Sequence, residues 1–232
     1  MIVVITGASQ GIGYAIANQF AQAGNTLLMC SKTQANIELA AKNLAVQYPD
    51  ATVHFTKADL SIKEDCLQFA QWCLNKGTPD ILINNAGFFL PGHIQDESDN
   101  ILEQQMAVNL YSAYHTTRAL LPSMLKIGKG HIFNICSIAS LDAYAQGGSY
   151  SISKFALLGF SKNLRLELKD KGIKVTAVCP GATYTHSWDG SGVEPSRIME
   201  ANDIAKMIFA AAHLSPQAVV EDIIMRPLKG DL

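Results

Sequence analysis

Short apolar runs alternate with longer segments of helical periodicity along the chain. The runs contain mainly β-branched and aliphatic residues, which is typical of strands buried on both faces of a parallel sheet. We expect such strands at 2–6, 26–30, 51–58, 79–84, 131–136, 173–179 and 219–225. Between them, apolar residues at intervals of three and four indicate a helix that begins near Ile12. Further helices are expected at 34–47, 62–76, 101–125, 149–170 and 201–214.

This alternation predicts an α/β fold of the Rossmann type, a doubly wound parallel sheet with helices on both faces. The expected order of its seven strands is 3-2-1-4-5-6-7. A chain of 232 residues without an internal repeat or linker fits a single domain, residues 1–232. The polar, glycine-containing stretch near 186–200 interrupts the pattern, and we interpret it as a short lid over a substrate site.

Charge and cysteine usage argue against several classes of function. The formal net charge is -2 with both signs scattered, so no basic face predicts a nucleic acid partner or a membrane surface. No apolar run reaches the ~18 residues that span a bilayer. Five cysteines and six histidines are dispersed without metal-ligand spacing, and the cysteines fit buried thiols in a reducing compartment. We therefore expect a cytoplasmic protein with a small-molecule partner and no metal.

Three glycines follow the first predicted strand directly. Gly7, Gly11 and Gly13 follow the run at 2–6 and overlap the start of the helical pattern formed by Ile12, Ile16 and Phe20. Glycine lets the backbone approach a pyrophosphate, and the first amides of the helix then face the negative charge. The position after a buried strand predicts a nucleotide site, although the spacing G-x-x-x-G-x-G differs from the common G-x-G-x-x-G fingerprint.

A hydroxyl, a phenol and an ammonium group occur together in the stretch from Ser137 to Lys154. Tyr150 and Lys154 are four residues apart, so on a helix they share one face. An ammonium beside a phenol favours the phenolate and lowers the phenol pKa from about 10 toward neutrality. Ser137 ends a predicted buried strand, where open α/β sheets bind ligands. For the Tyr-x-x-x-Lys pattern alone, the alternative interpretation is a solvated helix face.

Together these motifs resemble the short-chain dehydrogenase/reductase family. Residues 6–13 read TGASQGIG, residues 84–87 read NNAG, and Ser137 precedes Tyr150 by thirteen positions, as in that family. The resemblance covers essentially the whole chain. It implies an enzyme that transfers hydride between a nicotinamide cofactor and a carbonyl or secondary alcohol.

The resemblance also implies a role for each catalytic candidate. Tyr150 would donate a proton to the carbonyl oxygen, and Ser137 would donate a hydrogen bond to the same oxygen. Lys154 would bind the nicotinamide ribose and lower the pKa of the tyrosine. Asn109 would hold a water beside the lysine and complete the proton path, its alternative being a solvated residue of the helix at 101–125.

The same resemblance places the cofactor across the carboxyl ends of the strands. Asp59 and Leu60 are expected beside the adenine, although an N-cap of the next helix is an alternative role for Asp59. Thr183 departs from the family, which more usually has Val or Ile there, but the contact is largely through the backbone. The expected cofactor contacts are Gly7, Ser9, Gln10, Gly11, Ile12, Gly13, Ser31, Lys32, Asp59, Leu60, Asn85, Ala86, Gly87, Tyr150, Lys154, Pro180, Gly181, Thr183 and Thr185.

The end of the second predicted strand indicates NADP(H) rather than NAD(H). Ser31, Lys32 and Thr33 offer two hydroxyls and an ammonium where an acidic residue would accept hydrogen bonds from a free ribose 2′-hydroxyl. A basic residue at this place suits a 2′-phosphate instead. Gln10 is neutral where many NADP-preferring relatives have a second basic residue, so the expected preference depends on Lys32.

Apolar and aromatic residues dominate the segments that would surround a substrate, which favours a small to medium, apolar carbonyl compound or alcohol. These segments are 88–95, the stretch after Ser137 and the lid at 186–200. The residues expected to line the pocket are Phe88, Leu141, Tyr144, His186 and Trp188.

The predicted helices at 101–125 and 149–170 carry more apolar residues than one side of a sheet needs, which favours a homodimer or homotetramer. Two other classes of function stay open. One is a non-redox epimerase or dehydratase, although such family members are usually longer and carry GxxGxxG. The other is a non-catalytic dinucleotide-binding sensor, although all four catalytic positions are filled here.

Overall fold

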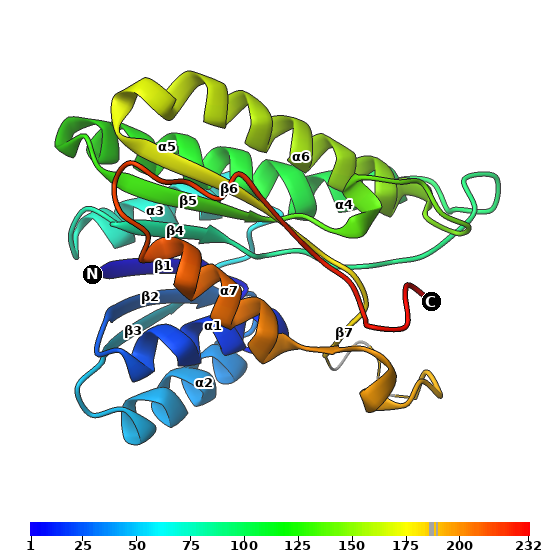
Figure 1. Cartoon of the computed structure of the whole chain (residues 1–232), viewed down its shortest axis with the longest axis horizontal. Helices are drawn as coiled ribbons and strands as arrows, with labels where there is room; N and C mark the ends of the chain where they lie inside the picture. The colour runs from blue at the N-terminus through cyan, green and yellow to red at the C-terminus, as the bar shows by residue number, and fades with distance from the viewer. Residues whose placement is uncertain (186–187, 189) are drawn as a thin grey trace.

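The computed structural model describes residues 1–185, 188 and 190–232. Strands and helices alternate along the chain, and the sheet lies between two layers of helices (Figure 1). One layer contains α3 (Lys63–Leu74), α4 (Ile101–Met106), α5 (Ser112–Ile127) and α6 (Gly148–Leu168). The opposite layer contains α1 (Gly11–Gln22), α2 (Gln34–Gln47) and α7 (Ala201–Ala212).

Within the described part of the chain, seven parallel strands form the main sheet. Their spatial order is β3 (Thr52–Lys57), β2 (Thr26–Ser31), β1 (Ile2–Thr6), β4 (Ile81–Asn84), β5 (Gly130–Ile135), β6 (Ile173–Pro180) and β9 (Asp222–Met225). The predicted α/β fold and strand order are confirmed, β9 being the seventh predicted strand. Two further strands, β7 (Thr183–Tyr184) and β8 (Met199–Glu200), pair with each other apart from this sheet.

Successive residues of each strand enter different hydrophobic cores, because side chains alternate across a sheet. In β1, Val3 and Ile5 pack in the core that contains α1 and α7, whereas Val4 packs in the core that contains α3, α5 and α6. Phe20 and Phe209 join α1 to α7, with ring centroids 5.1 Å apart. Burial on both faces explains why the inner strands are largely apolar runs, whereas the edge strands β3 and β9 are partly exposed.

The predicted single helix at 101–125 is wrong in one respect. A π-helical turn, Ala107–Tyr111, interrupts it between α4 and α5. Such a turn inserts an extra residue and is frequent at functional sites. Here it accommodates Asn109, whose fully buried side chain binds the segment after β4.

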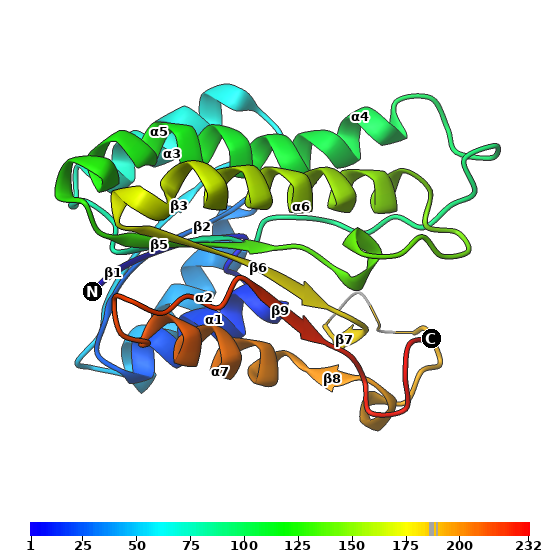
Figure 2. The same ribbon diagram turned by 45° about the horizontal axis from the view of Figure 1, so that its top comes forward.

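The loops that follow β1, β4, β5 and β6 gather at the carboxyl edge of the sheet, on the right in Figure 1 and Figure 2. β1 has β2 on one side and β4 on the other, so the chain reverses its direction of travel across the sheet there. Ligands of open α/β sheets bind at this switch point.

The described residues include neither a membrane-spanning helix nor a cluster of metal-ligating side chains. No helix among them has both the length and the apolar character needed to cross a membrane. They also contain no group of three or more His, Cys, Asp and Glu side chains that could hold a metal ion.

Candidate active site

Backbone geometry and lack of space require glycine in the turn between β1 and α1. Gly7 has a φ of 64° and Gly11 a φ of 58°, in the left-handed region that favours glycine. A Cβ on Gly13 would lie 2.3 Å from the Gly7 carbonyl oxygen and 2.4 Å from Asn85 Nδ2. A side chain at position 13 would therefore push α1 away from β1.

Thr6 and Asn85 fasten the glycine turn to the end of β4. The Thr6 hydroxyl accepts hydrogen bonds from the amides of Asn85 and Ala86, each at 2.9 Å. In return, Asn85 Nδ2 donates to the carbonyls of Thr6 and Gly7, each at 2.9 Å. The Asn85 side chain is thus occupied in bracing the turn, so a cofactor contact from this residue would come from its backbone.

The start of α1 fits the pyrophosphate of a dinucleotide. Among the described residues, Gln10 is an N-cap without a side-chain hydrogen bond to the helix, and the first turn contains no acidic side chain. Helix amides and the positive end of the helix dipole are thus left for an anion. Ser9 is half-buried and Gln10 exposed, whereas Ile12 packs against the core.

Ser137 follows β5, and its hydroxyl lies near the Tyr150 phenol at the start of α6, where it acts to lower the pKa of that phenol. Ser137 also caps a short 3-10 turn, because its hydroxyl accepts from the Ala139 amide at 3.1 Å. Its own amide donates to Ser140 Oγ at 3.1 Å. These bonds fix the serine backbone while its hydroxyl remains beside the phenol.

Lys154 lies one helical turn after Tyr150 and is only 5% exposed. Its Nζ donates to the Ile135 carbonyl at 2.8 Å and lies 5.8 Å from the centroid of the Tyr150 ring. No carboxylate among the described residues pairs with it. A Cβ on Gly87 would lie 3.6 Å from Nζ, so the backbone after β4 passes close by. The remaining N–H donors of this buried ammonium fit the hydroxyls of a ribose.

Burial, rather than the neighbouring ammonium, determines the direction in which the Tyr150 pKa moves. Desolvation raises this pKa above its ordinary value of 10.0, and the hydrogen bond with Ser137 opposes the rise. Burial also lowers the pKa of Lys154. Desolvation thus outweighs any opposing effect of Lys154 on the tyrosine pKa, and the role of Lys154 in lowering that pKa stays a prediction. The neutral phenol, which is the proton-donating form, is the stable form at neutral pH.

Asn109 holds the segment after β4 against α6. Its Oδ1 accepts from the Phe88 amide at 2.9 Å, and its Nδ2 donates to the Phe88 carbonyl at 3.2 Å. Nδ2 also donates to Ser153 Oγ at 2.9 Å, and that hydroxyl donates to the Tyr150 carbonyl at 2.7 Å. The alternative of a solvated helix residue is wrong, since Asn109 is fully buried.

Comparison with known proteins shows to which family these motifs belong. A family model described as short chain dehydrogenase matches residues 1–193. A sepiapterin reductase from Chlorobaculum tepidum is 33% identical over 240 residues, which cover 100% of this chain and 98% of the relative. The chain belongs to the short-chain dehydrogenase/reductase family. The resemblance predicted from the sequence is confirmed.

Solved structures support the same assignment. An alcohol dehydrogenase from the archaeon Thermococcus sibiricus, complexed with 5-hydroxy-NADP, matches with a TM-score of 0.90 and 26% identity. The match covers 98% of this chain and 96% of that one. A closed form of serine dehydrogenase complexed with NADP+ also has a TM-score of 0.90 and 26% identity, covering 100% and 97% of the two chains.

In the region predicted to contact the adenosine of the cofactor, Lys32 and Asp59 form an ion pair with a distance of 2.9 Å between Nζ and Oδ2. The lysine side chain is 76% exposed and that of the aspartate 22%. Asp59 also accepts from the amide and hydroxyl of Ser61. Burial alone would raise the pKa of Asp59, but hydrogen bonds from Ser61 and Lys32 hold it below its ordinary value. The N-cap of α3 is Ile62, so the N-cap alternative for Asp59 is wrong.

Ser31 and Leu60 flank this ion pair in the chain. The Ser31 hydroxyl donates to the Thr33 carbonyl at 3.2 Å, at the end of β2. The Leu60 side chain is buried in the core that contains α3. Contact between Leu60 and an adenine ring would therefore come mainly from the Leu60 backbone.

The segment after β6 passes over the glycine turn of the family motif. Pro180 ends β6, and the Gly181 amide donates to the Met225 carbonyl at 2.8 Å. Thr183 Oγ1 then donates to the Gly181 carbonyl at 2.9 Å as β7 begins. Thr185 Cγ2 lies 3.0 Å from the position of a Cβ on Gly11. Gly11 belongs to the glycine turn and Thr185 to the segment after β6. These two predicted cofactor contacts thus lie next to each other.

Aromatic groups adjoin the phenol on the predicted substrate side. The Phe89 ring packs edge-on against Tyr150, with centroids 4.8 Å apart, whereas the neighbouring Phe88 is held by its backbone. Burial raises the pKa of Tyr144 to about 12, and the nearby Tyr150 adds to the rise. Trp188 is half-buried. His186, the other aromatic residue predicted in the lid, lies outside the described residues.

Three buried serines around the tyrosine are functional candidates that the sequence analysis does not name. The Ser151 hydroxyl donates to the Ala139 carbonyl at 3.0 Å, and Ser149 bonds to Glu97. Ser153 accepts from Asn109. The repeated serines of the run SYSISK are the only signal in the local sequence. The hydrogen-bond partners of Ser151, Ser149 and Ser153 lie 12, 52 and 44 positions away, respectively.

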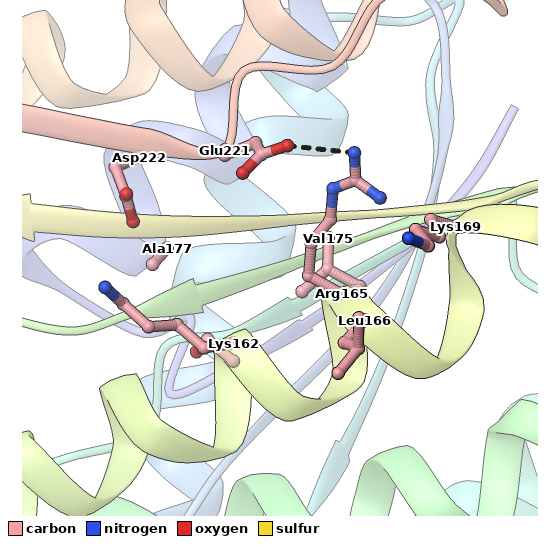
Figure 3. A pocket seen from close by; sticks show the side chains of 9 residues that line it. Lys162, Arg165, Leu166, Lys169, Val175, Ala177, Glu221 and Asp222 are labelled. Atoms are coloured by element: carbon pink, nitrogen blue, oxygen red, sulfur yellow. Dashed lines mark hydrogen bonds and ion pairs between the residues drawn. The ribbon is translucent and has the colours of Figure 1, made fainter.

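A separate cavity of about 390 Å³ lies between α6, β6 and β9 (Figure 3). Arg165 reaches across it to Glu221, with an ion-pair distance of 2.9 Å. Its lining, drawn from the described residues, contains none of the catalytic candidates. We therefore assign this cavity no part in the candidate active site.

Proposed function

We propose that this protein is an NADP(H)-dependent oxidoreductase that interconverts a carbonyl group and a secondary alcohol on a small to medium, apolar substrate. The observation that carries the proposal is the meeting of the Tyr150 phenol, the Ser137 hydroxyl and the buried Lys154 ammonium. They lie at the same edge of the sheet as the glycine turn. The names of a reductase and an alcohol dehydrogenase among the relatives support this type of reaction.

The proton chemistry follows from the side chains of this chain. During reduction, the neutral phenol of Tyr150 donates its proton to the carbonyl oxygen, and the Ser137 hydroxyl stabilises the charge that develops there. Lys154 orients the ribose and stabilises the phenolate that remains. NADPH supplies the hydride when it is bound. Alcohol oxidation uses the same groups in reverse, with the phenolate as the base.

A carbonyl panel tests the reaction. Purified protein and NADPH are mixed with apolar ketones, aldehydes and diketones, and with sepiapterin because a relative is named for it. We expect the absorbance of the reduced cofactor to fall with at least one compound. NADPH binding without turnover would favour the non-catalytic sensor. Conversion of a compound without cofactor oxidation would favour the epimerase or dehydratase.

The end of β2 supports NADP(H) over NAD(H). As the family resemblance implies, we expect the Ser31 hydroxyl and the Lys32 ammonium to contact the 2′-phosphate. The Lys32 ammonium is mostly exposed and paired with Asp59. Exposed ion pairs contribute little free energy, so a phosphate with a larger charge can compete for the lysine. Two structural relatives complexed with NADP-type cofactors add support.

We expect kcat/KM to be about ten- to hundredfold higher with NADPH than with NADH, because hydrogen bonds to charged groups contribute roughly 1.5–3 kcal/mol. Ser31→Asp should shift this ratio toward NADH, since a carboxylate repels the 2′-phosphate and accepts from a free hydroxyl. Steady-state rates with both cofactors and one substrate measure the ratio. Ser215→Asp, at an exposed serine after α7, is the matched control. Equal efficiencies in the parent, or no shift in Ser31→Asp, would show that this strand end does not recognise the phosphate.

We also expect a homodimer or homotetramer. On α6, Ile152, Phe155 and Leu166 are large apolar side chains that are exposed. Tyr111, on the π-helical turn before α5, is exposed as well. Apolar surface of this extent favours an interface with a second copy. Light scattering at micromolar concentration should give at least twice the 25.1 kDa of one chain, and a mass at the monomer value would contradict this.

A further inference from the structure

Two loops that are far apart in the sequence lie side by side at the carboxyl edge of the sheet, as Figure 1 and Figure 2 both show. The first is the wall segment, which we define as residues 88–95. The second is the loop 141–147, which leads into α6. The Gly92 amide donates to the Gln146 carbonyl at 3.0 Å. The wall segment is thus joined to residues just before Tyr150.

Glu97 supplies a cap that the start of α6 lacks. The N-cap residue is Gly147, which has no side chain, and the fully described first turn contains no acidic residue. Glu97 Oε1 accepts from the Ser149 amide at 2.9 Å, and Oε2 accepts from the Ser149 hydroxyl. A carboxylate at this place satisfies a helix amide and complements the positive end of the helix dipole. The Glu97 carboxylate therefore performs the capping function that the side chain of an N-cap residue usually performs, although Glu97 belongs to a segment that is distant in the sequence.

The surroundings of Gly148 show that Glu97 and the wall segment pack closely against the first residue of α6. Its φ is 40°, in the left-handed region. A Cβ at this position would lie 2.2 Å from Glu97 Oε1 and 2.5 Å from the Gly92 carbonyl oxygen. Both segments thus pack directly on the backbone that precedes the tyrosine.

The wall segment is held at both ends. At its start, Asn109 binds the amide and the carbonyl of Phe88. At its far end, the Glu97 amide donates to the His93 carbonyl at 3.0 Å. Between these anchors, the Phe89 ring rests against the Tyr150 ring. Glu97 consequently connects the wall of the predicted substrate pocket to the helical turn that carries the phenol.

We propose that Glu97 is a positioning residue that fixes the Tyr150 phenol relative to the wall of the substrate pocket. The proposal rests on the function proposed above. Glu97 acts through Ser149, the residue directly before the proton donor. Displacing a catalytic group by about 1 Å can lower a rate by ~10²-fold, so loss of this cap should be visible in turnover. The Lys154 ammonium is held separately by the Ile135 carbonyl and the glycine turn by Asn85, so cofactor binding should persist.

Glu97→Ala tests the proposal, with Asp96→Ala as the matched control. Asp96 is an exposed neighbour whose carboxylate accepts from the exposed Gln95 at 3.4 Å. We expect kcat for carbonyl reduction to fall about tenfold or more in Glu97→Ala, while the NADPH dissociation constant stays near the parent value. Asp96→Ala should keep the parent kcat. Glu97→Gln retains an acceptor for the Ser149 amide and should recover most of the lost rate, which a general loss of stability would not explain.

Hydrogen exchange of the cofactor-free protein adds a measurement that does not need turnover. Peptides covering 145–153 should exchange faster in Glu97→Ala than in the parent or Asp96→Ala. Unchanged exchange, a parent-like kcat, equal losses in both alanine variants or a parallel loss of NADPH binding would each overturn the proposal. If Glu97→Ala does not fold, Ser149→Ala, which removes one of the two bonds, is judged by the same criteria.

The exchange measurement also separates this proposal from the proposed function. A parent protein that binds NADPH but reduces no carbonyl would overturn the proposed function, and with it the catalytic part of the Glu97 role. Faster exchange in Glu97→Ala would still establish the cap. A parent that turns over, beside a Glu97→Ala variant that matches it, would overturn only the inference about Glu97.

Discussion

Replacing Tyr150 with phenylalanine is expected to lower kcat for carbonyl reduction by ~10²–10⁴-fold, the range typical of general acid catalysis. The substitution removes the transferable proton and keeps the ring, so the edge-on packing against Phe89 is retained. NADPH affinity should stay close to that of the parent, because Lys154 and the glycine turn are unchanged. Steady-state kinetics and a fluorescence titration with NADPH measure the two quantities separately.

Tyr48→Phe is the matched control for this variant. Tyr48 follows α2, and its hydroxyl donates to Asn18 away from the catalytic groups. It should therefore keep the parent kcat. A Tyr150→Phe variant that retains more than about a tenth of the parent kcat would contradict the assignment of Tyr150 as proton donor.

Lys154→Met is expected to impair cofactor binding and turnover together. Methionine keeps an unbranched apolar stem but removes the donors proposed for the ribose, so the NADPH dissociation constant should rise about ten- to hundredfold. Turnover should fall as well, since no ammonium stabilises the phenolate. The Ile135 carbonyl also loses its donor, which costs about 1–3 kcal/mol when a buried group is left unpaired. Calorimetric titration measures the NADPH dissociation constant, and steady-state kinetics measure turnover. Thermal unfolding measures the loss of stability caused by the unpaired Ile135 carbonyl.

Lys162→Met controls for the loss of a charge on the same helix. Lys162 is exposed and lines the separate cavity beside β6 and β9. This variant should bind NADPH and turn over like the parent. Parent-like NADPH affinity in Lys154→Met would rule out the ribose-binding role, and a parent-like kcat would rule out the role in proton transfer.

The inner strands of the sheet could be located in the sequence because they are buried on both faces. Val3 and Val4 enter different cores, so β1 appears in the sequence as a continuous apolar run with clear ends. Two-residue strands such as β7 and β8 contain too few positions for any period to be recognised. The π-helical turn around Asn109 could not be predicted either, because the insertion of one residue hardly changes the spacing of apolar residues along a helix.

The site was predictable where its residues belong to one strand, loop and helix. Ser137, Tyr150 and Lys154 meet because β5 is followed in the chain by a short 3-10 turn, a loop and α6, so their spacing alone carries the information. The direction of the Tyr150 pKa could not be predicted, since it depends on desolvation by segments that are distant in sequence. The bond between Glu97 and Ser149 spans 52 positions and has no local signal. The cofactor contacts of the glycine turn and of the segment after β6 stay predictions.

The tight packing around Gly13 has a consequence for the energetics of dinucleotide binding. The space that a side chain would need there is filled by the Gly7 carbonyl and the Asn85 amide, and Thr6 closes the same set of hydrogen bonds. The turn is thus preorganised by the protein itself. Rigid sites lose little conformational entropy when a ligand binds. In the proposed complex, more of the interaction energy between a pyrophosphate and these backbone amides would therefore remain available as affinity.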